Sequence, residues 1–199
     1  MIGKKLKQIS RIYKLKQQNV HISYCSYVSN FCTIGSWTKI NGECFLSASK
    51  KAPLSIGKYC AIAHNFRVRT RNHSSNYANI QFHFAREYDF SFPEDSRGEV
   101  RIGNACWIGD NVMILPGVEI GDGCIIGAGS IVTKSLEPYS VACGVPSKII
   151  RRRFDSSIIE ELMKYQWWDW PVSRIKKNKR FFELDLTRIS AQELVDIIL

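Results

Sequence analysis

The stretch IGNACWIGDNVMILPGVEIGDGCIIGAGSIV, residues 102–132, places an aliphatic side chain at every sixth position. The same period runs through the N-terminal half of the chain. The positions that share it are Ile22, Val28, Ile34, Ile40, Leu46, Ile56, Ile62, Val68, Ile102, Ile108, Ile114, Ile120, Ile126 and Val132. A period of six fits neither an α-helix nor a simple alternating strand. It predicts an all-β solenoid of short strands joined by turns, with three hexapeptides in each triangular coil.

Two insertions interrupt the period. Extra residues before Ile56 predict a small bulge at residues 50–53, and after Val68 the period stops for a long excursion, residues 69–99. Long loops without periodicity in a compact domain are usually functional or disordered, and the aromatic residues crowded into positions 77–92 argue against disorder. The excursion either packs on the side of the solenoid or forms an arm that reaches a neighbouring subunit and walls a substrate pocket. We favour the arm.

The cysteines follow the same repeat. Seven are present, without a CxxC pair. Five stand four residues after an aliphatic position of the repeat: Cys32, Cys44, Cys60, Cys106 and Cys124. A small side chain in one repeated position predicts a buried thiol that packs as a hydrophobe, rather than a disulfide, a zinc ligand or a catalytic thiol. We therefore expect no metal requirement.

The charge of the chain points to an anionic partner. The formal net charge is +10, with basic residues concentrated at the two ends of the chain. A phosphate-bearing cofactor, an anionic membrane surface or nucleic acid would each fit this charge, but no nucleic-acid recognition motif is present, so we expect no nucleic-acid partner. No apolar run approaches the roughly 18 residues that span a bilayer, and the N-terminus lacks a secretory signal. The expected location is the cytoplasm.

The first segment, residues 1–19, is basic and has helical spacing. Ile2, Leu6, Ile9 and Tyr13 recur at that spacing among lysines and arginine, without an acidic residue. Such a helix could cover the open edge of the first coil, which we favour. It could also lie on the inner face of the cell membrane, as a peripheral anchor on anionic lipid.

The solenoid domain is expected over residues 20–153, followed by a helical segment at residues 154–199. Ser157 with Glu160, and Ser190 with Glu193, have the spacing of capping boxes and predict two helices. The three tryptophans of WWDWP are expected to pack this end of the chain.

Residues 102–154, together with WWDWP at residues 167–171, closely resemble the hexapeptide-repeat acyltransferases, in the xenobiotic or type B chloramphenicol acetyltransferase branch. The resemblance covers about residues 20–171. It implies a left-handed parallel β-helix, a homotrimer, and acetyl-CoA bound along the C-terminal coils between two subunits. It says much about the fold and little about the acceptor.

In that branch a histidine at the start of the excursion is the general base, and the motif HSSNYA resembles the branch at His73. Imidazole can accept a proton from an attacking hydroxyl and return it to the leaving thiolate. The aromatic excursion suggests Tyr77, Phe82 and His83 as further acceptor contacts. Asn76 stands where the branch commonly has an acid, which weakens the case for a charged contact there.

The resemblance also implies the donor site. The matching positions are Trp107, Gly109, Asp110, Ala128, Thr133, Lys134, Lys148 and Arg151. Lys and Arg suit phosphate by charge and by donor geometry. The alternative is a solvated basic edge that touches no ligand.

These features predict an acetyl-CoA-dependent O-acetyltransferase that acts by direct transfer, without an acetyl-enzyme, on a sugar hydroxyl of a surface polysaccharide (O-antigen or capsule) or its precursor. Alternatives are an antibiotic O-acetyltransferase acting on chloramphenicol or a streptogramin, and a nucleotide-amino-sugar N-acetyltransferase. A γ-class carbonic anhydrase would need three zinc-binding histidines, and His64, His73 and His83 lack the expected spacing. A catalytically idle scaffold would keep the repeat but not bind CoA.

Overall fold

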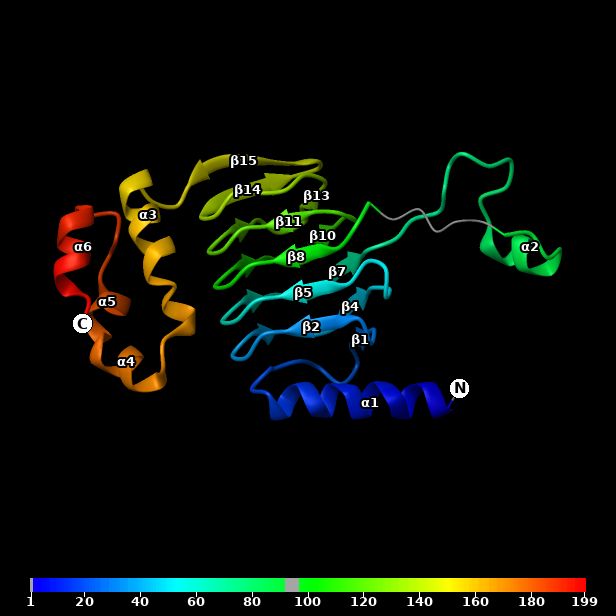
Figure 1. Ribbon diagram of the computed structural model, residues 1–199, viewed down its shortest axis with the longest axis horizontal. Coiled ribbons are helices and arrows are strands. Elements are labelled where there is room, and N and C mark those ends of the chain that lie inside the picture. The colour runs from blue at the N-terminus through cyan, green and yellow to red at the C-terminus, as the bar shows by residue number, and fades with distance from the viewer. Residues whose placement is uncertain (1, 92–96) are drawn as a thin grey trace.

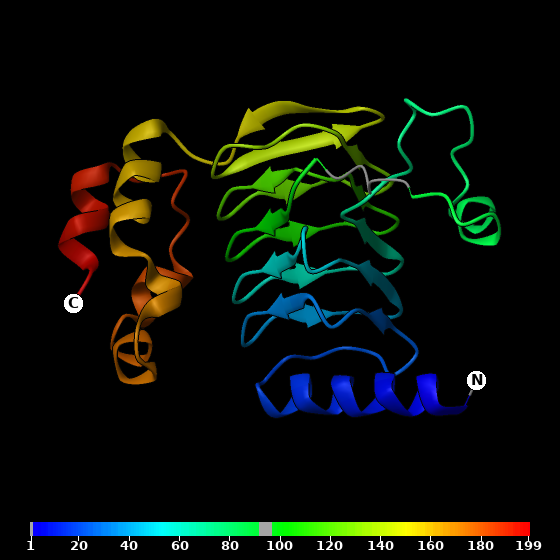
Figure 2. The same cartoon turned by 45° about the vertical axis from the view of Figure 1, so that its right-hand side comes forward.

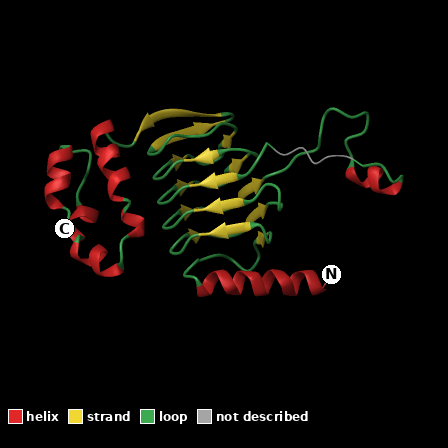
Figure 3. Ribbon diagram, in the orientation of Figure 1, coloured by secondary structure: helices red, strands yellow, loops and turns green. Residues whose placement is uncertain are grey.

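The computed structural model describes residues 2–91 and 97–199, so Met1 and residues 92–96 of the predicted excursion lie outside the described residues. Its centre is a stack of short strands (Figures 1 and 3). Helix α1 (Ile2–Gln17) lies across one end of the stack, and a hairpin of β14 (Ser140–Gly144) and β15 (Ser147–Arg152) covers the other. The C-terminal helices lie along one side of the stack, and the excursion leaves from the other side (Figure 1).

The strands form three sheets, one for each side of a triangular solenoid. Sheet I contains, in spatial order, β1 (Tyr27–Val28), β4 (Cys44–Ser47), β7 (Phe66–Arg69), β10 (Met113–Ile114) and β13 (Ile131–Val132). Sheet II contains β11 (Glu119–Ile120), β8 (Val100–Ile102), β5 (Leu54–Ile56) and β2 (Cys32–Ile34). Sheet III contains β15, β14, β12 (Ile125–Ile126), β9 (Trp107–Ile108), β6 (Ala61–Ile62) and β3 (Lys39–Ile40). All pairings are parallel except that of β14 with β15.

The repeat positions stack directly on one another inside the solenoid. In sheet I, Val28 pairs with Leu46, Leu46 with Val68, Val68 with Ile114, and Ile114 with Val132. Every aliphatic position of the repeat is buried, and so are the five cysteines of the repeated position. The predictions of a parallel solenoid and of structural cysteines are therefore confirmed.

Both insertions leave at the same edge, where the chain passes from sheet I to sheet II. The bulge lies between β4 and β5, where Ser49 and Ala52 exchange backbone hydrogen bonds of 3.1 and 3.2 Å. The excursion lies between β7 and β8 and contains the short helix α2 (Phe82–Glu87). In two views 45° apart, α2 stands away from the solenoid (Figures 1 and 2), and the rings of Tyr88 and Phe90 are exposed. The excursion thus projects from the solenoid instead of lying flat against it.

Helix α1 covers the first coil. Ile12 and Leu15 are buried against it. The side chain of Gln8 donates to the backbone oxygen of Val28 at 3.2 Å and accepts from its backbone nitrogen at 3.1 Å. Arg11 donates to the carbonyl oxygen of the first residue of β2 at 2.5 Å. The helix therefore closes the open edge with two polar and two apolar side chains, and the apolar stripe predicted from the sequence faces away from the coil.

The C-terminal segment folds as α3 (Ser156–Tyr165), the 3-10 helix η1 (Trp167–Asp169), α4 (Val172–Lys177), α5 (Lys179–Glu183) and α6 (Ala191–Ile197). The prediction of two helices missed α4 and α5, which are too short to show a clear helical period. The predicted cap at Ser157 is wrong: α3 begins at Ser156, so Asp155 is the N-cap residue and Ser157 lies in the first turn. The capping box of Ser190 with Glu193 is confirmed.

The C-terminal helices are attached at the edge between sheets II and III. Lys58 forms an ion pair with Asp169 at 2.8 Å, and the ring of Tyr59 lies 5.1 Å from that of Trp167. Trp168 and Trp170 are buried, which agrees with a packing role for these side chains. In the part of the chain that the structure describes, no helix combines the length and apolarity needed to cross a membrane.

Candidate functional site

His73 lies where the excursion leaves β7. Its Nδ1 atom is 2.5 Å from the backbone carbonyl oxygen of Ile80. A carbonyl oxygen can only accept a hydrogen bond, so Nδ1 carries the proton and donates it. The Nε2 atom of the neutral ring is then left with its lone pair. The ring also packs on Phe82, with ring centroids 4.7 Å apart. Two contacts within the excursion thus orient a ring whose free nitrogen can accept a proton.

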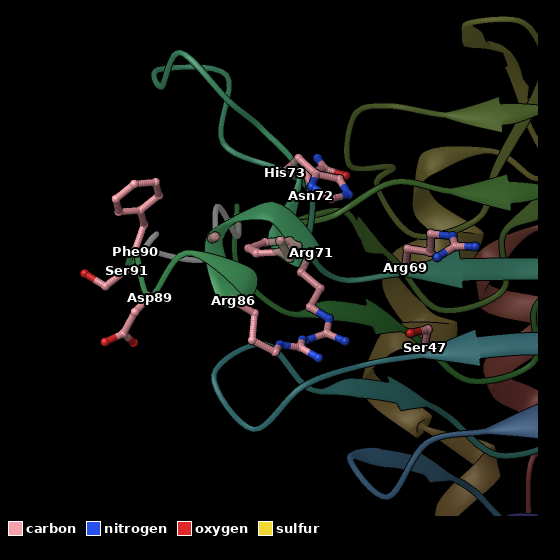
Figure 4. Close-up of a pocket in the computed structure, with 11 residues that line it drawn as sticks. Ser47, Arg69, Arg71, Asn72, His73, Arg86, Asp89, Phe90 and Ser91 are labelled. Atoms are coloured by element: carbon pink, nitrogen blue, oxygen red, sulfur yellow. The ribbon is translucent and has the colours of Figure 1, made fainter.

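A cavity of about 780 Å³ opens beside His73 (Figure 4). Its lining contains Ser47, Arg69, Arg71, Asn72, His73, Phe82, Ala85, Arg86, Asp89, Phe90 and Ser91. A volume of this order can hold a small molecule or the end of a larger one. It is the space in which an acceptor could meet the imidazole.

Four of the lining residues that we did not predict are charged: Arg69, Arg71, Arg86 and Asp89. In Figure 4 the side chains of Arg71 and Arg86 point toward one another, while Asp89 and Phe90 point the other way. Three arginines and one aspartate line the cavity among the described residues, so these side chains carry a net positive charge. The closely spaced arginines of RVRTR, residues 67–71, were the only sequence signal for this feature.

The predicted acceptor contacts divide into two groups. Phe82 lines the cavity and touches the His73 ring. Asn76, Tyr77 and His83 are exposed parts of the excursion and do not line this cavity. If these three side chains contact an acceptor, they do so outside the cavity beside His73.

Four of the predicted donor residues lie together at the edge between sheets III and I. Trp107 is on β9, with 56% of its surface exposed. A Cβ atom on Gly109 would lie 2.6 Å from the backbone nitrogen of Ala128 in the next coil, so this close contact requires glycine. Asp110 accepts from the backbone nitrogen of His64 at 2.8 Å and lies 3.3 Å from its Nδ1. These contacts produce a tightly packed corner with an exposed tryptophan.

The remaining donor residues are spread over other places. Thr133 and Lys134 follow β13, and β13 stacks on β10, which stacks on β7. Thr133 and Lys134 therefore lie on the same edge of the solenoid as the excursion, between sheets I and II, but two coils closer to the C-terminal end of the stack. Lys148 and Arg151 are on β15, whose side chains are largely exposed. One chain thus does not gather the eight donor residues into one place.

His73 and the corner of Trp107 belong to different edges of the solenoid. The excursion leaves between sheets I and II, whereas Trp107, Gly109 and Ala128 lie at the transition from sheet III to sheet I. Within the described residues, the lining of the cavity beside His73 includes none of the predicted donor residues. A general base and a donor groove on separate edges can meet only if a second subunit supplies one of them.

Two of the buried thiols, those of Cys44 and Cys124, are poor nucleophiles. Burial raises the pKa of the Cys44 thiol to about 11, and burial likewise raises the pKa of the Cys124 thiol to about 11. A thiol attacks as its thiolate, so both are held in the unreactive form at neutral pH. Among residues 2–91 and 97–199, no three His, Cys, Asp or Glu side chains gather in a way that could hold a metal ion.

Comparisons with known proteins agree with the arrangement of strands. Residues 99–134 match the family described as bacterial transferase hexapeptide (six repeats). The chain is 33% identical over 171 residues to a chloramphenicol acetyltransferase of Morganella morganii, which covers 82% of this chain and 81% of that protein. It is 43% identical over 138 residues to a probable macrolide acetyltransferase of Lysinibacillus sphaericus, which covers 63% of this chain and 74% of that protein.

A solved structure shares the fold. AntD, an N-acyltransferase from Bacillus cereus in complex with dTDP and 3-hydroxybutyryl-CoA, superposes with a TM-score of 0.56 at 22% identity. The superposition covers 77% of this chain and 94% of that chain.

Proposed function

The chain belongs to the hexapeptide-repeat acetyltransferases and is an acyltransferase, and we propose that it transfers an acetyl group from acetyl-CoA to a hydroxyl group with His73 as the general base. The observation that carries this proposal is the hydrogen bond from His73 Nδ1 to the carbonyl oxygen of Ile80. This bond holds the ring in the tautomer whose Nε2 can accept a proton.

The transfer runs through two steps. Nε2 of His73 takes the hydroxyl proton as the acceptor oxygen attacks the thioester carbonyl carbon, and a carbon–oxygen bond forms. The carbon–sulfur bond then breaks, and the departing CoA sulfur takes the proton back from Nε2. The Ile80 carbonyl accepts from Nδ1 throughout, so it favours the positively charged ring that exists between the two steps. No cysteine is acetylated.

We place the reaction between two subunits of a homotrimer of left-handed β-helices. The excursion of one subunit would bring His73 to the groove beside Trp107 and Ala128 of its neighbour. Two observations support this arrangement: the separate edges of the two groups, and the exposed rings of Tyr88 and Phe90, which an interface would cover. Exposed aromatic residues are frequent at the centres of protein interfaces.

The donor groove would hold acetyl-CoA along the C-terminal coils. Exposed Trp107 offers an apolar surface for the pantetheine arm, and the close contact of Gly109 with Ala128 fixes the corner beside it. Lys134, Lys148 and Arg151 would meet the phosphates, since Lys and Arg bind them through charge-assisted hydrogen bonds. Asp110 belongs to the same corner, whereas Thr133, on the edge that carries the excursion, would come from the subunit that supplies His73.

For the acceptor we propose a sugar hydroxyl in a surface polysaccharide or its precursor. The net positive charge of the cavity lining favours an acceptor that carries negative charge, such as an acidic or phosphate-linked sugar, over a neutral drug. Phe82 offers a ring face on which a sugar could pack.

A drug hydroxyl is the second candidate, and the comparisons favour it. Two relatives are described as a chloramphenicol acetyltransferase and a probable macrolide acetyltransferase. The same base and the same donor would serve this reaction, so the two candidates differ only in the acceptor.

The acceptor is tested by measuring thiol release from acetyl-CoA with a panel of compounds. The panel contains chloramphenicol, a macrolide, a streptogramin, nucleotide sugars, nucleotide amino sugars and polymeric glycans, with the His73→Ala variant as background. Acetylation of a glycan or sugar precursor at a hydroxyl supports the proposal. Acetylation of drugs alone would replace the proposed acceptor while keeping His73 in its role, and acetylation of amines alone would overturn O-acetyl transfer.

A further inference from the structure

The face of α1 that points away from the solenoid carries an exposed apolar stripe. Leu6, Ile9 and Tyr13 are 60%, 40% and 56% exposed. They are spaced by three and four residues, which places them on one side of a helix. The opposite side is the one that holds Gln8, Arg11, Ile12 and Leu15 against the first coil.

This stripe forms part of the end surface of the molecule. Figures 1 and 2 show α1 lying across the end of the stack, with the coils on one side of it only. A flat partner could therefore contact the whole outer face of α1 without meeting the excursion or the C-terminal helices. Exposed apolar stripes of this kind mark interaction surfaces.

Lysines flank the stripe on both sides. Lys5 and Lys16 are three helical turns apart and lie directly beside the stripe, whereas Lys7 and Lys14 are seven residues apart and lie further round the helix on the other side, beyond Ser10 and Gln17. All four are exposed. Lys16 also lies over the ring of Tyr24, 4.2 Å from its centroid, which extends the surface to a second exposed aromatic residue.

No acidic side chain opposes these lysines along the helix, because residues 1–20 contain none. An apolar stripe between rows of lysine is the pattern of helices that lie in the interface of a membrane. The stripe enters the boundary between headgroups and acyl chains, while the lysines attract anionic headgroups. Water would solvate the lysines but not the apolar stripe, and a neutral apolar protein surface would cover the stripe but not pair with the lysines.

We propose that the outer face of α1, formed by Lys5, Leu6, Lys7, Ile9, Tyr13, Lys14 and Lys16, binds an anionic lipid surface with the solenoid standing on its end. This binding goes beyond acetyl transfer and does not depend on it. β7 is the third strand of sheet I counted from α1, so His73 leaves the solenoid roughly 10 Å above the first coil at the ordinary strand spacing. The enzyme would thus hold its general base a short distance above the membrane.

The test is flotation of the full-length protein with lipid vesicles. Wild-type protein is expected to float with vesicles of phosphatidylcholine and phosphatidylglycerol. With vesicles of phosphatidylcholine alone, it should remain in the bottom fraction. The variant Leu6→Ser, Ile9→Ser, Tyr13→Ser should lose flotation. The variant Lys7→Gln, Lys14→Gln should bind about fivefold more weakly for each lysine removed.

Two matched controls test whether lipid binding depends on the outer face of α1 or only on the number of exposed lysines and apolar side chains in the protein. Lys176→Gln with Lys177→Gln removes two exposed lysines of α4, and Val172→Ser removes an exposed apolar side chain of the same helix. Both should float as wild type does. Thermal unfolding and thiol release with a soluble acceptor should be unchanged in every α1 variant, which shows that the fold and the catalytic site are intact.

Several results would overturn the proposal. These are absence of wild-type flotation, equal flotation with neutral and anionic vesicles, and α1 variants that float like wild type. If the stripe variant instead lowers the mass measured by light scattering and vesicles are ignored, the stripe joins two copies of the chain, and the lipid proposal is wrong.

Discussion

The Nδ1 atom of His73 lies 2.5 Å from the backbone carbonyl oxygen of Ile80, and this contact gives the two ring nitrogens different roles. Nδ1 donates a hydrogen bond inside the excursion, and Nε2 is left as the proton acceptor. The excursion therefore carries both the proposed base and the group that orients its ring. It can move to a neighbouring subunit as one unit without losing this arrangement.

His73→Ala is expected to lower turnover about 10²–10⁴-fold, because positioned general-base catalysis contributes on that order. Binding of CoA should be unchanged, since His73 is proposed to contact only the reacting groups and the corner of Trp107 and Ala128 lies on another edge. Turnover is measured by thiol release and CoA binding by calorimetry. As a control, His21→Ala removes an exposed histidine of the first coil and should leave turnover and CoA binding unchanged. Near-normal turnover of His73→Ala would show that His73 is not the general base.

Lys148→Gln should raise the KM for acetyl-CoA about tenfold or more and leave kcat unchanged, because a charge-assisted hydrogen bond to phosphate contributes about 1.5–3 kcal/mol. A lost contact that is equal in ground state and transition state changes KM alone. Lys176→Gln on α4 is the matched control for charge. Steady-state kinetics with varied acetyl-CoA decide the matter, and a fall in kcat at constant KM would contradict a phosphate contact.

Alkaline pH should weaken the fold through its buried thiols. The ordinary pKa of a thiol is 9.0 here, and burial raises the pKa of Cys44 and of Cys124 to about 11. The folded state holds these protons more tightly than the unfolded state, so their stabilising contribution is complete below pH 9 and is lost as the pH rises through 11. Each thiol should contribute about 3 kcal/mol to this loss, since one pKa unit corresponds to about 1.4 kcal/mol.

The measurement is the free energy of unfolding in urea at a series of alkaline pH values, with a reductant present. The variant Cys44→Ala, Cys124→Ala serves as the comparison, because other groups also titrate in this range. Its stability should fall less steeply than that of wild type. Parallel slopes for the two proteins would show that these thiols do not titrate between pH 9 and 11.

Gly103→Ala should destabilise the solenoid by about 1–3 kcal/mol, the usual cost of overpacking. A Cβ atom there would lie 2.6 Å from the backbone nitrogen of Asp122 in the next coil, so two coils would have to separate. Gly3→Ala makes the same chemical change in α1, where nothing lies within 4 Å, and should be neutral or stabilise by up to about 1 kcal/mol. Urea unfolding distinguishes the two, and equal effects would contradict the close coil contact.

The solenoid could be predicted from the sequence because one physical rule repeats. Each hexapeptide must bury its aliphatic side chain against the coils above and below, so the period of six is visible without any structure. The same rule identified the cysteine position and the point after Val68 where the excursion begins. Ile80 could not be predicted as the partner of His73, because a backbone carbonyl has no sequence signature.

The orientation of α1 shows a second limit. The stripe of Leu6, Ile9 and Tyr13 is the more apolar face, yet the helix turns its other face to the coil. The first coil exposes backbone groups that need hydrogen-bond partners, and Gln8 and Arg11 supply them. Hydrophobic spacing alone cannot reveal that choice. The short helices α4 and α5 were missed for a related reason, since contacts such as that of Phe181 with Trp170 stabilise them in place of a helical period.

In the proposed reaction, the base of one subunit serves the donor groove of another. Coexpression of two differently tagged variants tests it, His73→Ala with an intact groove and Ala128→Trp, which fills the groove from an exposed position. Each variant alone should be inactive. In a ring of three, any mixed trimer holds one interface that joins an intact His73 to an intact groove, so trimers purified through both tags should regain about one third of wild-type thiol release. Mixed trimers as inactive as the two parents would contradict the account.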